Sequence, residues 1–319
     1  MSAAVNSEMI SSGLNCSRNR ISVLVPSYRR PQQLERCLAA LVSQERHADQ
    51  IIIVIHAEDD ETRRVVLQRK GRLPIDMVEV AVTGQVWALN AGLAHVRGEI
   101  VAITDDDAAP RPQWLKRIEE HFSSDPKIGG VGGRDWVHED GTIVQGQKTL
   151  VGRVLWFGRI VGDHHQGGGA ARDVDILKGA NCSFRMAAIQ NIGFDSRLRG
   201  KGAQVHNDML ASLAVRKAGW RLVYDPDVAV DHFPAQRFDN DQRRSFNSTA
   251  TADRTYNLRL ALRMVSPGWK RMAALIWFYL VGTRDEPGLL SFLRMLARRE
   301  PYAVQRFRSA HGFLFERQQ

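Results

Sequence analysis

The sequence "VAITDDDAAPRPQWL", residues 101–115, runs from an apolar segment directly into three consecutive aspartates. Residues 99–104 are expected to form a buried strand, so Asp105, Asp106 and Asp107 stand together where that strand ends. Two like unit charges about 4 Å apart repel by roughly 4 kcal/mol at an effective dielectric near 20. A divalent cation relieves this repulsion, and Mg²⁺ usually binds through one or two carboxylates together with substrate phosphates. The run is therefore a candidate site for Mg²⁺ or Mn²⁺ with a diphosphate. Taken alone, it is better explained by a solvated loop whose first residue caps a helix near Trp114, and only the neighbouring sequence favours the metal site.

The residues before this run indicate an α/β fold. Strands are expected over 21–26, 50–56, 75–82 and 99–104, with helices over 31–44, 60–70 and 84–98 between them. Strands that alternate with helices at this spacing form a mostly parallel sheet, covered on both faces and joined by right-handed crossovers. Ligands bind at the carboxyl ends of the strands in such sheets. The polar strand ends at 26–28, 56–60 and 105–107 are thus expected to share one crevice.

The pattern changes beyond residue 125. We expect a glycine-rich hairpin over 128–147, a mobile lid or acceptor loop over 162–173, a strand and short helix over 176–193, a helix over 207–220 and two short strands over 221–233. His164 and His165 are adjacent and would point in different directions, which argues against a metal site there. The organisation predicted is a disordered lead-in at 1–20, one large domain at 21–238 and a helical, arginine-rich region at 239–319.

Composition restricts the partners and the compartment. The 319 residues carry a net charge of +9 and 44% hydrophobic residues, which is enough to bury a large core. The positive charge favours phosphorylated substrates, an acidic membrane surface or nucleic acid, but no nucleic-acid recognition motif is present. Cys16, Cys37 and Cys182 are too few for a disulfide framework, which favours the cytoplasm. Residues 1–20 contain no apolar core of the length that a signal peptide requires, and no apolar stretch reaches the length of a membrane-spanning helix.

Four segments, taken in order, resemble the family 2 glycosyltransferases, which have the GT-A fold. They are "ISVLVPSYRRPQQLERCLAAL" from residue 21, "GQVWALNAGLAHVRGEIVAITDDDAAPRPQWL" from 84, "GANCSFR" from 179 and "HNDMLASLAVRKAGWRLVYDPDVAVDH" from 206. The resemblance implies a GT-A, Rossmann-like sheet flanked by helices, with the catalytic domain over 21–238. It also implies a sugar carried on a nucleotide diphosphate as the substrate.

The resemblance assigns one group of residues to the sugar donor. The residues implied to bind it are Pro26, Ser27, Tyr28, His56, Glu58, Gln85, Asn90, Asp105 and Asp106, while Asp105, Asp107 and His232 are implied to approach the metal. The sequence departs from the family at two positions on this side. His56 stands where many relatives have an aspartate that recognises the base, and Leu89 replaces a frequent arginine. Neutralisation of the phosphates would then fall to Arg29, Arg30 or a lysine elsewhere.

A second group is assigned to the acceptor side. "HND" at 206–208 falls where the family usually has Glu-Asp, which makes Asp208 the candidate general base and leaves Asn207 beside it. The residues expected to shape the sugar and acceptor pocket are Gly179, Ala180, Asn181, Asn207 and Trp136. An inverting transfer needs a single base to deprotonate the acceptor hydroxyl. The simpler alternatives are that Asp208 or Asn207 only caps its helix, and that His232 and Trp136 only pack.

Two functions from different classes follow. The first is a metal-dependent inverting glycosyltransferase that transfers a sugar to a glycan or a lipid-linked acceptor. The second is a catalytically silent module that binds a sugar nucleotide or a glycan and scaffolds a membrane-associated assembly, an alternative suggested by His56 and Asn207. A nucleotidyltransferase would need a basic, glycine-rich phosphate loop after the first strand, and the sequence has none.

The tail leaves two alternatives open. Residues 266–312 combine apolar helical stripes with Lys270, Arg271, Arg294, Arg298 and Arg299. That composition is typical of helices that lie on an anionic membrane, here the inner face of the plasma membrane. The alternative is that these helices pack on the catalytic domain or on a second subunit.

Overall fold

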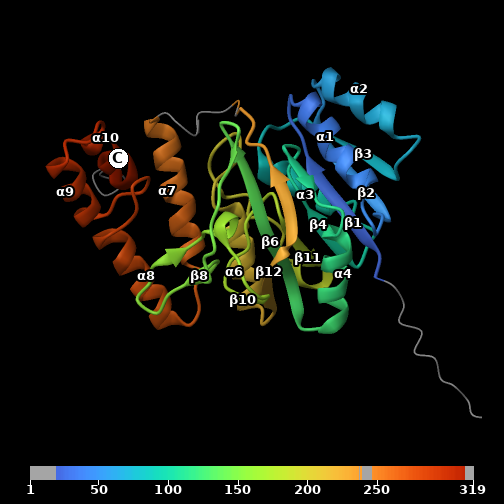
Figure 1. Ribbon diagram of the computed structural model, residues 1–319. Coiled ribbons are helices and arrows are strands. Elements are labelled where there is room, and N and C mark those ends of the chain that lie inside the picture. The colour runs from blue at the N-terminus through green and yellow to red at the C-terminus, as the bar shows by residue number, and fades with distance from the viewer. Residues whose placement is uncertain (1–18, 237, 239–245, 313–319) are drawn as a thin grey trace, which may run out of the picture.

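The computed structural model describes residues 19–236, 238 and 246–312. Within these residues a 10-stranded sheet has the order β10-β12-β6-β11-β4-β1-β2-β3, with β5 beside β12 and β7 beside β6 (Figure 1). Its strands are β1 (Ile21–Pro26), β2 (Gln50–His56), β3 (Ile75–Val80), β4 (Ile100–Ile103), β5 (Ala108–Pro110), β6 (Ile128–Glu139), β7 (Thr142–Ile143), β10 (Arg172–Val174), β11 (Cys182–Arg185) and β12 (Arg221–His232). A separate hairpin pairs β8 (Arg153–Val154) with β9 (Ile160–Val161).

The sheet is mostly parallel, as predicted. β3, β2, β1 and β4 are parallel neighbours, and β6 and β12 are parallel to each other. β11 lies between β4 and β6 and is antiparallel to both. The carboxyl ends of β1 to β4 therefore lie along one edge of the sheet, where the polar strand ends of the sequence come together.

Helices cover both faces of the sheet. They are α1 (Pro31–Val42), α2 (Asp60–Arg69), α3 (Gln85–Leu93), α4 (Trp114–Ser124), α5 (Met186–Ile189) and α6 (Asn207–Lys217). Alternate residues of β1 point to opposite faces of the sheet. Leu24 belongs to the hydrophobic core that includes residues of α3 and α6, whereas Val23 and Val25 belong to a second core with residues of α1, α2 and α4. Strands buried on both faces read as continuous apolar runs, which is the pattern of residues 21–25 and 50–55.

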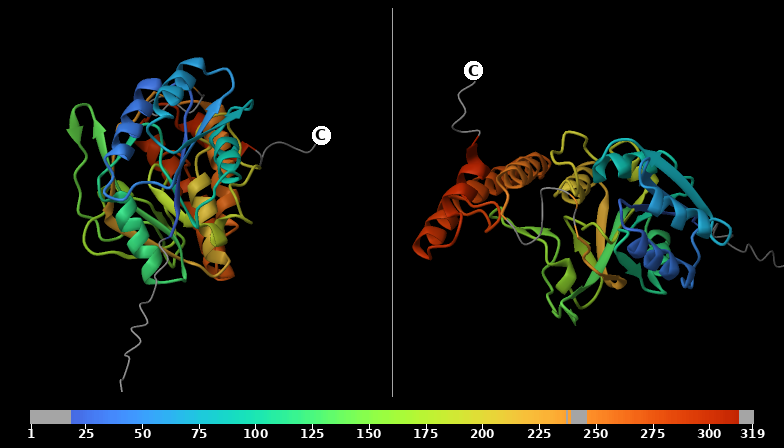
Figure 2. Two further views of the ribbon diagram at one scale, coloured as in Figure 1. Left: turned by 90° about the vertical axis from the view of Figure 1, so that its right-hand side faces the viewer. Right: turned by 90° about the horizontal axis from the view of Figure 1, so that it is seen from above.

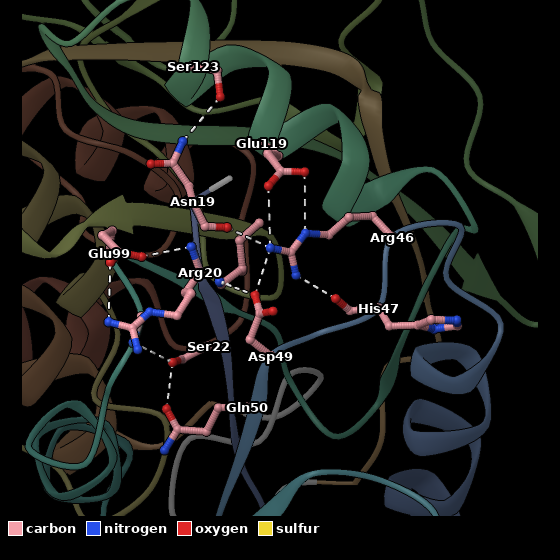
Figure 3. A network of polar contacts seen from close by, with 12 residues as sticks. Asn19, Arg20, Ser22, Arg46, His47, Asp49, Gln50, Glu99, Glu119 and Ser123 are labelled. Carbon is pink, nitrogen blue, oxygen red and sulfur yellow. Dashed lines mark hydrogen bonds and ion pairs between the residues drawn. The ribbon is translucent and has the colours of Figure 1, made fainter. Parts of the chain in front are cut away.

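A polar network fixes the opposite, amino-terminal edge of the sheet (Figure 3). The Asp49 carboxylate accepts from the Ile21 backbone N–H at 2.7 Å and pairs with Arg46 at 2.7 Å. Arg46 is 5% exposed and also contacts Glu119 at 3.4 Å. The guanidinium therefore joins the β1–β2 edge to α4, far from the strand ends that carry the candidate site.

Two of the predicted elements differ from the structure. The helix over 84–98 ends at Leu93, and the Gln50 side chain bonds the His95 carbonyl and the Arg97 N–H beyond it. Gly98 does not end this helix. A glycine is required there because a Cβ would lie 2.5 Å from the Arg20 carbonyl oxygen. Residues 221–232 form one strand whose register shifts between Asp225 and Val230, not two strands.

The helix near Trp114 receives no side-chain cap, so Asp105 is not its cap.

The C-terminal helices α7 (Ser248–Leu262), α8 (Gly268–Leu280), α9 (Leu289–Ala297) and α10 (Ala303–His311) lie at the end of the molecule away from α1 and α2 (Figures 1 and 2). Their inner residues, such as Leu258 and Phe278, share a core with Leu177 and Met209. The predicted packing on the large domain is thus confirmed for their inner sides. The predicted lead-in at 1–20, apart from its last two residues, and the predicted boundary at 238–239 lie outside the described residues. In the described part of the chain, no helix combines the length and apolarity needed to cross a membrane.

Candidate active site

A cleft of about 890 Å³ opens at the carboxyl ends of β1 to β4. The predicted sugar-donor and metal residues that line it are Pro26, Ser27, Tyr28, His56, Gln85, Asp105, Asp106 and Asp107. α7 completes the wall with residues such as Asp253 and Asn257, so the C-terminal region takes part in the site. The topology therefore brings together the strand ends that the sequence places far apart.

The three aspartates have different surroundings. Asp106 is 2% exposed, accepts from the Ser27 hydroxyl at 2.8 Å and pairs with Arg30 at 2.9 Å. Burial and the nearby Asp107 raise the pKa of Asp105 to about 7, and burial raises the pKa of Asp106 to about 6. Burial acts in the same direction on Asp107, but His232 and a backbone N–H prevail and lower its pKa to about 2. Negative charge is therefore concentrated on Asp107.

The pair formed by Asp107 and His232 fits a metal ion. The register of β5 and β12 places His232 opposite Ala108, and its Nε2 lies 3.3 Å from Asp107 Oδ1. Both side chains are buried, and neither that oxygen nor either ring nitrogen forms a hydrogen bond. Buried polar atoms left without a partner are costly unless another ligand satisfies them. Among the described residues no group of three or more His, Cys, Asp or Glu side chains encloses a metal site, so phosphate and water oxygens would supply the remaining ligands.

Positive charge in the cleft comes partly from a segment that sequence reasoning missed. Arg30, which was considered for the phosphates, lines the cleft together with Arg199 and Lys201 of the loop 198–205. Gln204 fixes this loop, because its Oε1 accepts from the Val86 N–H at 2.9 Å and its Nε2 donates to the Leu198 carbonyl at 2.9 Å. The signal was available as "RGKG" at 199–202, a basic, glycine-rich run just before the candidate base.

Tyr28 and His56 form an aromatic corner of the cleft. The Tyr28 ring meets the His56 ring edge-on at 5.7 Å, and His56 Nε2 lies 3.1 Å from the Ala81 carbonyl oxygen. Two other predicted sugar-donor residues do not line the cleft. Glu58 is exposed beyond its rim, and Asn90 uses its amide to bond the backbone N–H and C=O of Phe194 at 2.8 and 2.7 Å. Asn90 thus fastens α3 to a neighbouring loop.

Asp208 lines a second cavity, of about 270 Å³. It lies in the first turn of α6, where its Oδ2 accepts from the Gly179 N–H and its Oδ1 from the Met209 N–H, each at 2.7 Å. Lys178 lines the same cavity and donates to Asp135 at 2.7 Å. Burial disfavours its charge, but Asp135 and Asp208 prevail and raise the pKa of Lys178. The rest of the wall is mostly apolar and comes from α6, α7, α8 and the β8–β9 hairpin.

Hydrogen bonds join the acidic run to the start of α6. Gln85 donates to Asp105 Oδ1 at 3.3 Å and accepts from the Asn207 amide at 3.4 Å. Asn207 directly precedes Asp208 at the start of α6. The link to the candidate base is therefore through the backbone, and among the described residues the two cavities share no lining side chain.

The structure assigns several predicted acceptor residues to packing. Asn181 is 1% exposed, accepts from the Trp114 indole at 2.8 Å and donates to the Val228 carbonyl at 2.7 Å. Ala180 is also buried, and its carbonyl accepts from the Thr104 hydroxyl. Trp136 lies against the guanidinium of Arg134 at 3.6 Å and lines neither cavity.

The histidines of the 162–173 segment differ from each other. His164 is 2% exposed, its Nε2 lies 2.9 Å from the Ile176 carbonyl oxygen, and burial lowers its pKa. It lines the second cavity, whereas His165 does not.

Sequence comparison shows the family. The model named "Glycosyltransferase like family 2" matches residues 18–248. Glycosyltransferase AglE of Haloferax volcanii is 25% identical over 84% of this chain and 82% of its own length. The glucosyl-dolichyl phosphate glucuronosyltransferase of the same organism is 23% identical over 67% of this chain and 69% of its length. An uncharacterized glycosyltransferase of Nostoc sp. is 33% identical over 34% of this chain, an alignment that spans only 35% of the Nostoc protein.

Solved structures show the fold. The mannosyltransferase PcManGT from Pyrobaculum calidifontis, in complex with GDP-Man and Mn²⁺, aligns with 94% of this chain and 81% of its own at a TM-score of 0.58 and 19% identity. S. aureus TarS 1-349, in complex with UDP-GlcNAc, aligns with 91% of this chain and 81% of its own at a TM-score of 0.63 and 15% identity. The mixed, mostly parallel sheet is the fold shared with these structures, and the chain belongs to glycosyltransferase family 2.

Proposed function

We propose that this protein is a metal-dependent inverting glycosyltransferase that moves a sugar from a nucleotide diphosphate to a hydroxyl of a lipid-linked or glycan acceptor. The observation that carries the proposal is the pair of cavities, one with the acidic run and basic side chains, the other with Asp208, whose neighbour Asn207 bonds Gln85 of the first cavity. Family membership supports the class of reaction.

In the first cavity the residues bind the leaving group. Asp107 and His232 would hold Mg²⁺ or Mn²⁺, with Asp105 nearby, and the cation would neutralise the charge that develops on the departing diphosphate. Arg30, Arg199 and Lys201 add positive charge in the same cleft. The complexes of PcManGT with GDP-Man and Mn²⁺ and of TarS with UDP-GlcNAc support a nucleotide-sugar ligand for this fold.

In the second cavity Asp208 acts as the base. The two N–H bonds from Gly179 and Met209 fix the plane of its carboxylate while leaving lone pairs for the acceptor hydroxyl. Asp208 takes the hydroxyl proton as the oxygen attacks the anomeric carbon on the face opposite the diphosphate. Lys178 balances the charge of Asp208 before the proton arrives.

The wall of the second cavity favours an amphiphilic acceptor. Leu177, Met209, Leu258, Trp277 and Phe278 line it, so an apolar group beside the reacting hydroxyl would be buried there. A similar protein, the glucosyl-dolichyl phosphate glucuronosyltransferase, is named for a lipid-linked acceptor. We therefore place a lipid-linked acceptor before a free glycan.

The test is the variant Asp208→Asn, assayed for sugar transfer and for thermal stabilisation by nucleotide diphosphates with Mn²⁺. Removal of the base should lower kcat at least about 100-fold while nucleotide binding stays near the wild-type level. Asp227→Asn is the matched control, because that carboxylate is 70% exposed and lines neither cavity. Full transfer by Asp208→Asn would refute the assignment. Saturable nucleotide binding by the wild type without turnover on any donor would favour the silent binding module instead.

A further inference from the structure

The outward sides of α8 and α9 are apolar. On α8 the exposed large residues are Trp269, Met272, Ile276, Tyr279 and Leu280, and on α9 they are Leu289, Leu290, Leu293 and Leu296. Their spacing places each set along one side of its helix, opposite Phe278 on α8 and Met295 on α9, which are 2% and 3% exposed. A helix of a water-soluble protein normally turns its polar side outward. These two helices are apolar on both sides.

The tip of the β8–β9 hairpin, next to α8, carries two further exposed aromatic side chains. Trp156 is 73% exposed and Phe157 is also exposed. The hairpin lies against α8, since a Cβ on Gly158 would come within 2.4 Å of Ala274 Cα. Figure 1 shows β8 beside α8 at the end of the molecule away from α1 and α2. We call the outward residues of α8 and α9 together with Trp156 and Phe157 the apolar face.

The charge around the apolar face is strongly positive. Residues 263–312 contain nine Lys or Arg and three Asp or Glu, a net charge of +6 out of +9 for the whole chain. Two of the acids are compensated, since Glu300 pairs with Arg284 at 3.2 Å and Asp285 with Arg306 at 3.4 Å. Lys270 and Arg271 begin α8, while Arg294 and Arg298 lie at the end of α9. None of these four forms an ion pair with the residues that the structure describes.

These charges select one class of partner. A second copy of the chain would bring two strongly positive surfaces together, and like charges oppose such a contact. An anionic lipid surface satisfies both features, because acyl chains accept the apolar side chains and lipid phosphates attract the basic residues by about 1 kcal/mol each. Exposed Trp and Tyr side chains, such as Trp156 and Tyr279, suit the boundary between lipid and water.

We infer that the apolar face docks on an anionic membrane, with α8 and α9 lying in the plane of the lipid headgroups. α8 and α9 are 13 and 9 residues long, too short to cross a bilayer core but long enough to lie on its surface. For a cytoplasmic protein, as the sequence predicts, this membrane is the inner face of the plasma membrane.

Docking would also place the acceptor cavity at the membrane. That cavity is walled by Gly158 and Ile160 of the hairpin and by Ala274, Trp277 and Phe278 of α8, so it lies directly beneath the apolar face. This consequence rests on the proposed function, whereas docking itself does not. An acceptor anchored in the bilayer would reach Asp208 without leaving the membrane.

The test is flotation of the full chain with vesicles of phosphatidylcholine alone or mixed with an equal share of phosphatidylglycerol. Binding to the mixed vesicles and not to the neutral ones is expected, with release at high salt. Ile276→Gln combined with Leu293→Gln should weaken binding about 10-fold or more, because two inserted apolar side chains are lost. Val42→Gln combined with Leu67→Gln is the matched control, because these residues are 45% and 52% exposed on α1 and α2, against 52% and 51% for Ile276 and Leu293.

The possible outcomes distinguish membrane docking from self-association. Absence of flotation with the mixed vesicles, or equal loss in the two double variants, would overturn the inference. A concentration-dependent dimer that Ile276→Gln with Leu293→Gln abolishes would assign the apolar face to a second copy instead. Thermal stabilisation by nucleotide diphosphates, measured on the same proteins, reports on the cleft alone, so failure of docking and failure of the proposed function give different results.

Discussion

Asp107, which lines the cleft, faces the buried His232, which does not, with Oδ1 of the carboxylate 3.3 Å from Nε2 of the imidazole. The β5–β12 pairing fixes this arrangement, since His232 lies opposite Ala108, the residue after Asp107. Both atoms are potential metal ligands, and beyond this ion pair neither has a hydrogen-bond partner among the described residues. The pair is therefore the most specific indication of a divalent cation in this fold.

The first prediction concerns His232. His232→Ala should raise the Mn²⁺ concentration that gives half-maximal stabilisation by a nucleotide diphosphate about 10-fold or more, because one ligand is lost. Thermal-shift titrations of Mn²⁺ at saturating nucleotide measure this concentration. His138→Ala is the control, since His138 pairs at 2.9 Å with Asp231, the residue before His232 on β12, and that carboxylate is not part of the acidic run. An unchanged Mn²⁺ midpoint for His232→Ala would remove it from the metal site.

The second prediction concerns Arg30. Arg30→Gln should weaken nucleotide-diphosphate binding about 10-fold, because a charge-assisted contact contributes about 1.5–3 kcal/mol. Binding of the corresponding nucleoside should change little, since it has no phosphate. Isothermal titration with both ligands measures the difference, with Arg64→Gln on α2 as the exposed control. Equal losses for nucleoside and diphosphate would indicate that Arg30 only holds Asp106 in place.

The third prediction separates packing from ligand binding at Asn90. Asn90→Ala should lower the free energy of unfolding by about 1–3 kcal/mol, because the Phe194 backbone loses both of its hydrogen bonds to the amide. The nucleotide Kd should remain unchanged. Urea denaturation and titration of the same protein measure the two quantities. A weaker nucleotide affinity with unchanged stability would restore Asn90 to the sugar-donor site.

The fourth prediction concerns the polar network at the far edge of the sheet. Arg46→Ala should lower the free energy of unfolding by about 2–3 kcal/mol, since the guanidinium is buried and joins Asp49 to Glu119. Arg97→Ala removes an ion pair of the same 2.7 Å length to Asp76, but Arg97 is 67% exposed, so its loss should cost less than about 1 kcal/mol. Similar losses in the two variants would show that burial of Arg46 does not matter. Sugar transfer should be unaffected in both.

The strands and helices of the sheet were predictable because residues close together in the sequence mark each of them. Apolar runs such as 50–55 and the proline at 31 mark strands and a helix start without reference to the rest of the chain. Gly98 misled the prediction of a helix end, because its small size serves a close approach to Arg20, which is distant in sequence. β5 was not predicted, since three residues after an acidic run carry no strand pattern until β12 is beside them.

The site residues that directly follow a strand were predictable from the sequence. Those whose role depends on a contact with a residue far away in the chain were not. Asp107 and His232 are 125 residues apart, and only the family resemblance brought them together before the fold did. Asn181 has the composition of a ligand-binding residue, but its amide is committed to Trp114 and Val228. Arg199 and Lys201 were overlooked because a basic loop is usually solvated, and only its attachment through Gln204 directs it to the cleft.

The central claim is that the acidic run binds a diphosphate through a divalent cation. Titration of nucleoside diphosphates into the wild type and into Asp107→Asn, each with Mn²⁺ and with a chelator, measures this most directly. The account predicts that Mn²⁺ tightens binding about 10-fold or more in the wild type and has no effect in Asp107→Asn. Equal affinity of the wild type with and without Mn²⁺, or the same Mn²⁺ dependence in Asp107→Asn, would contradict it.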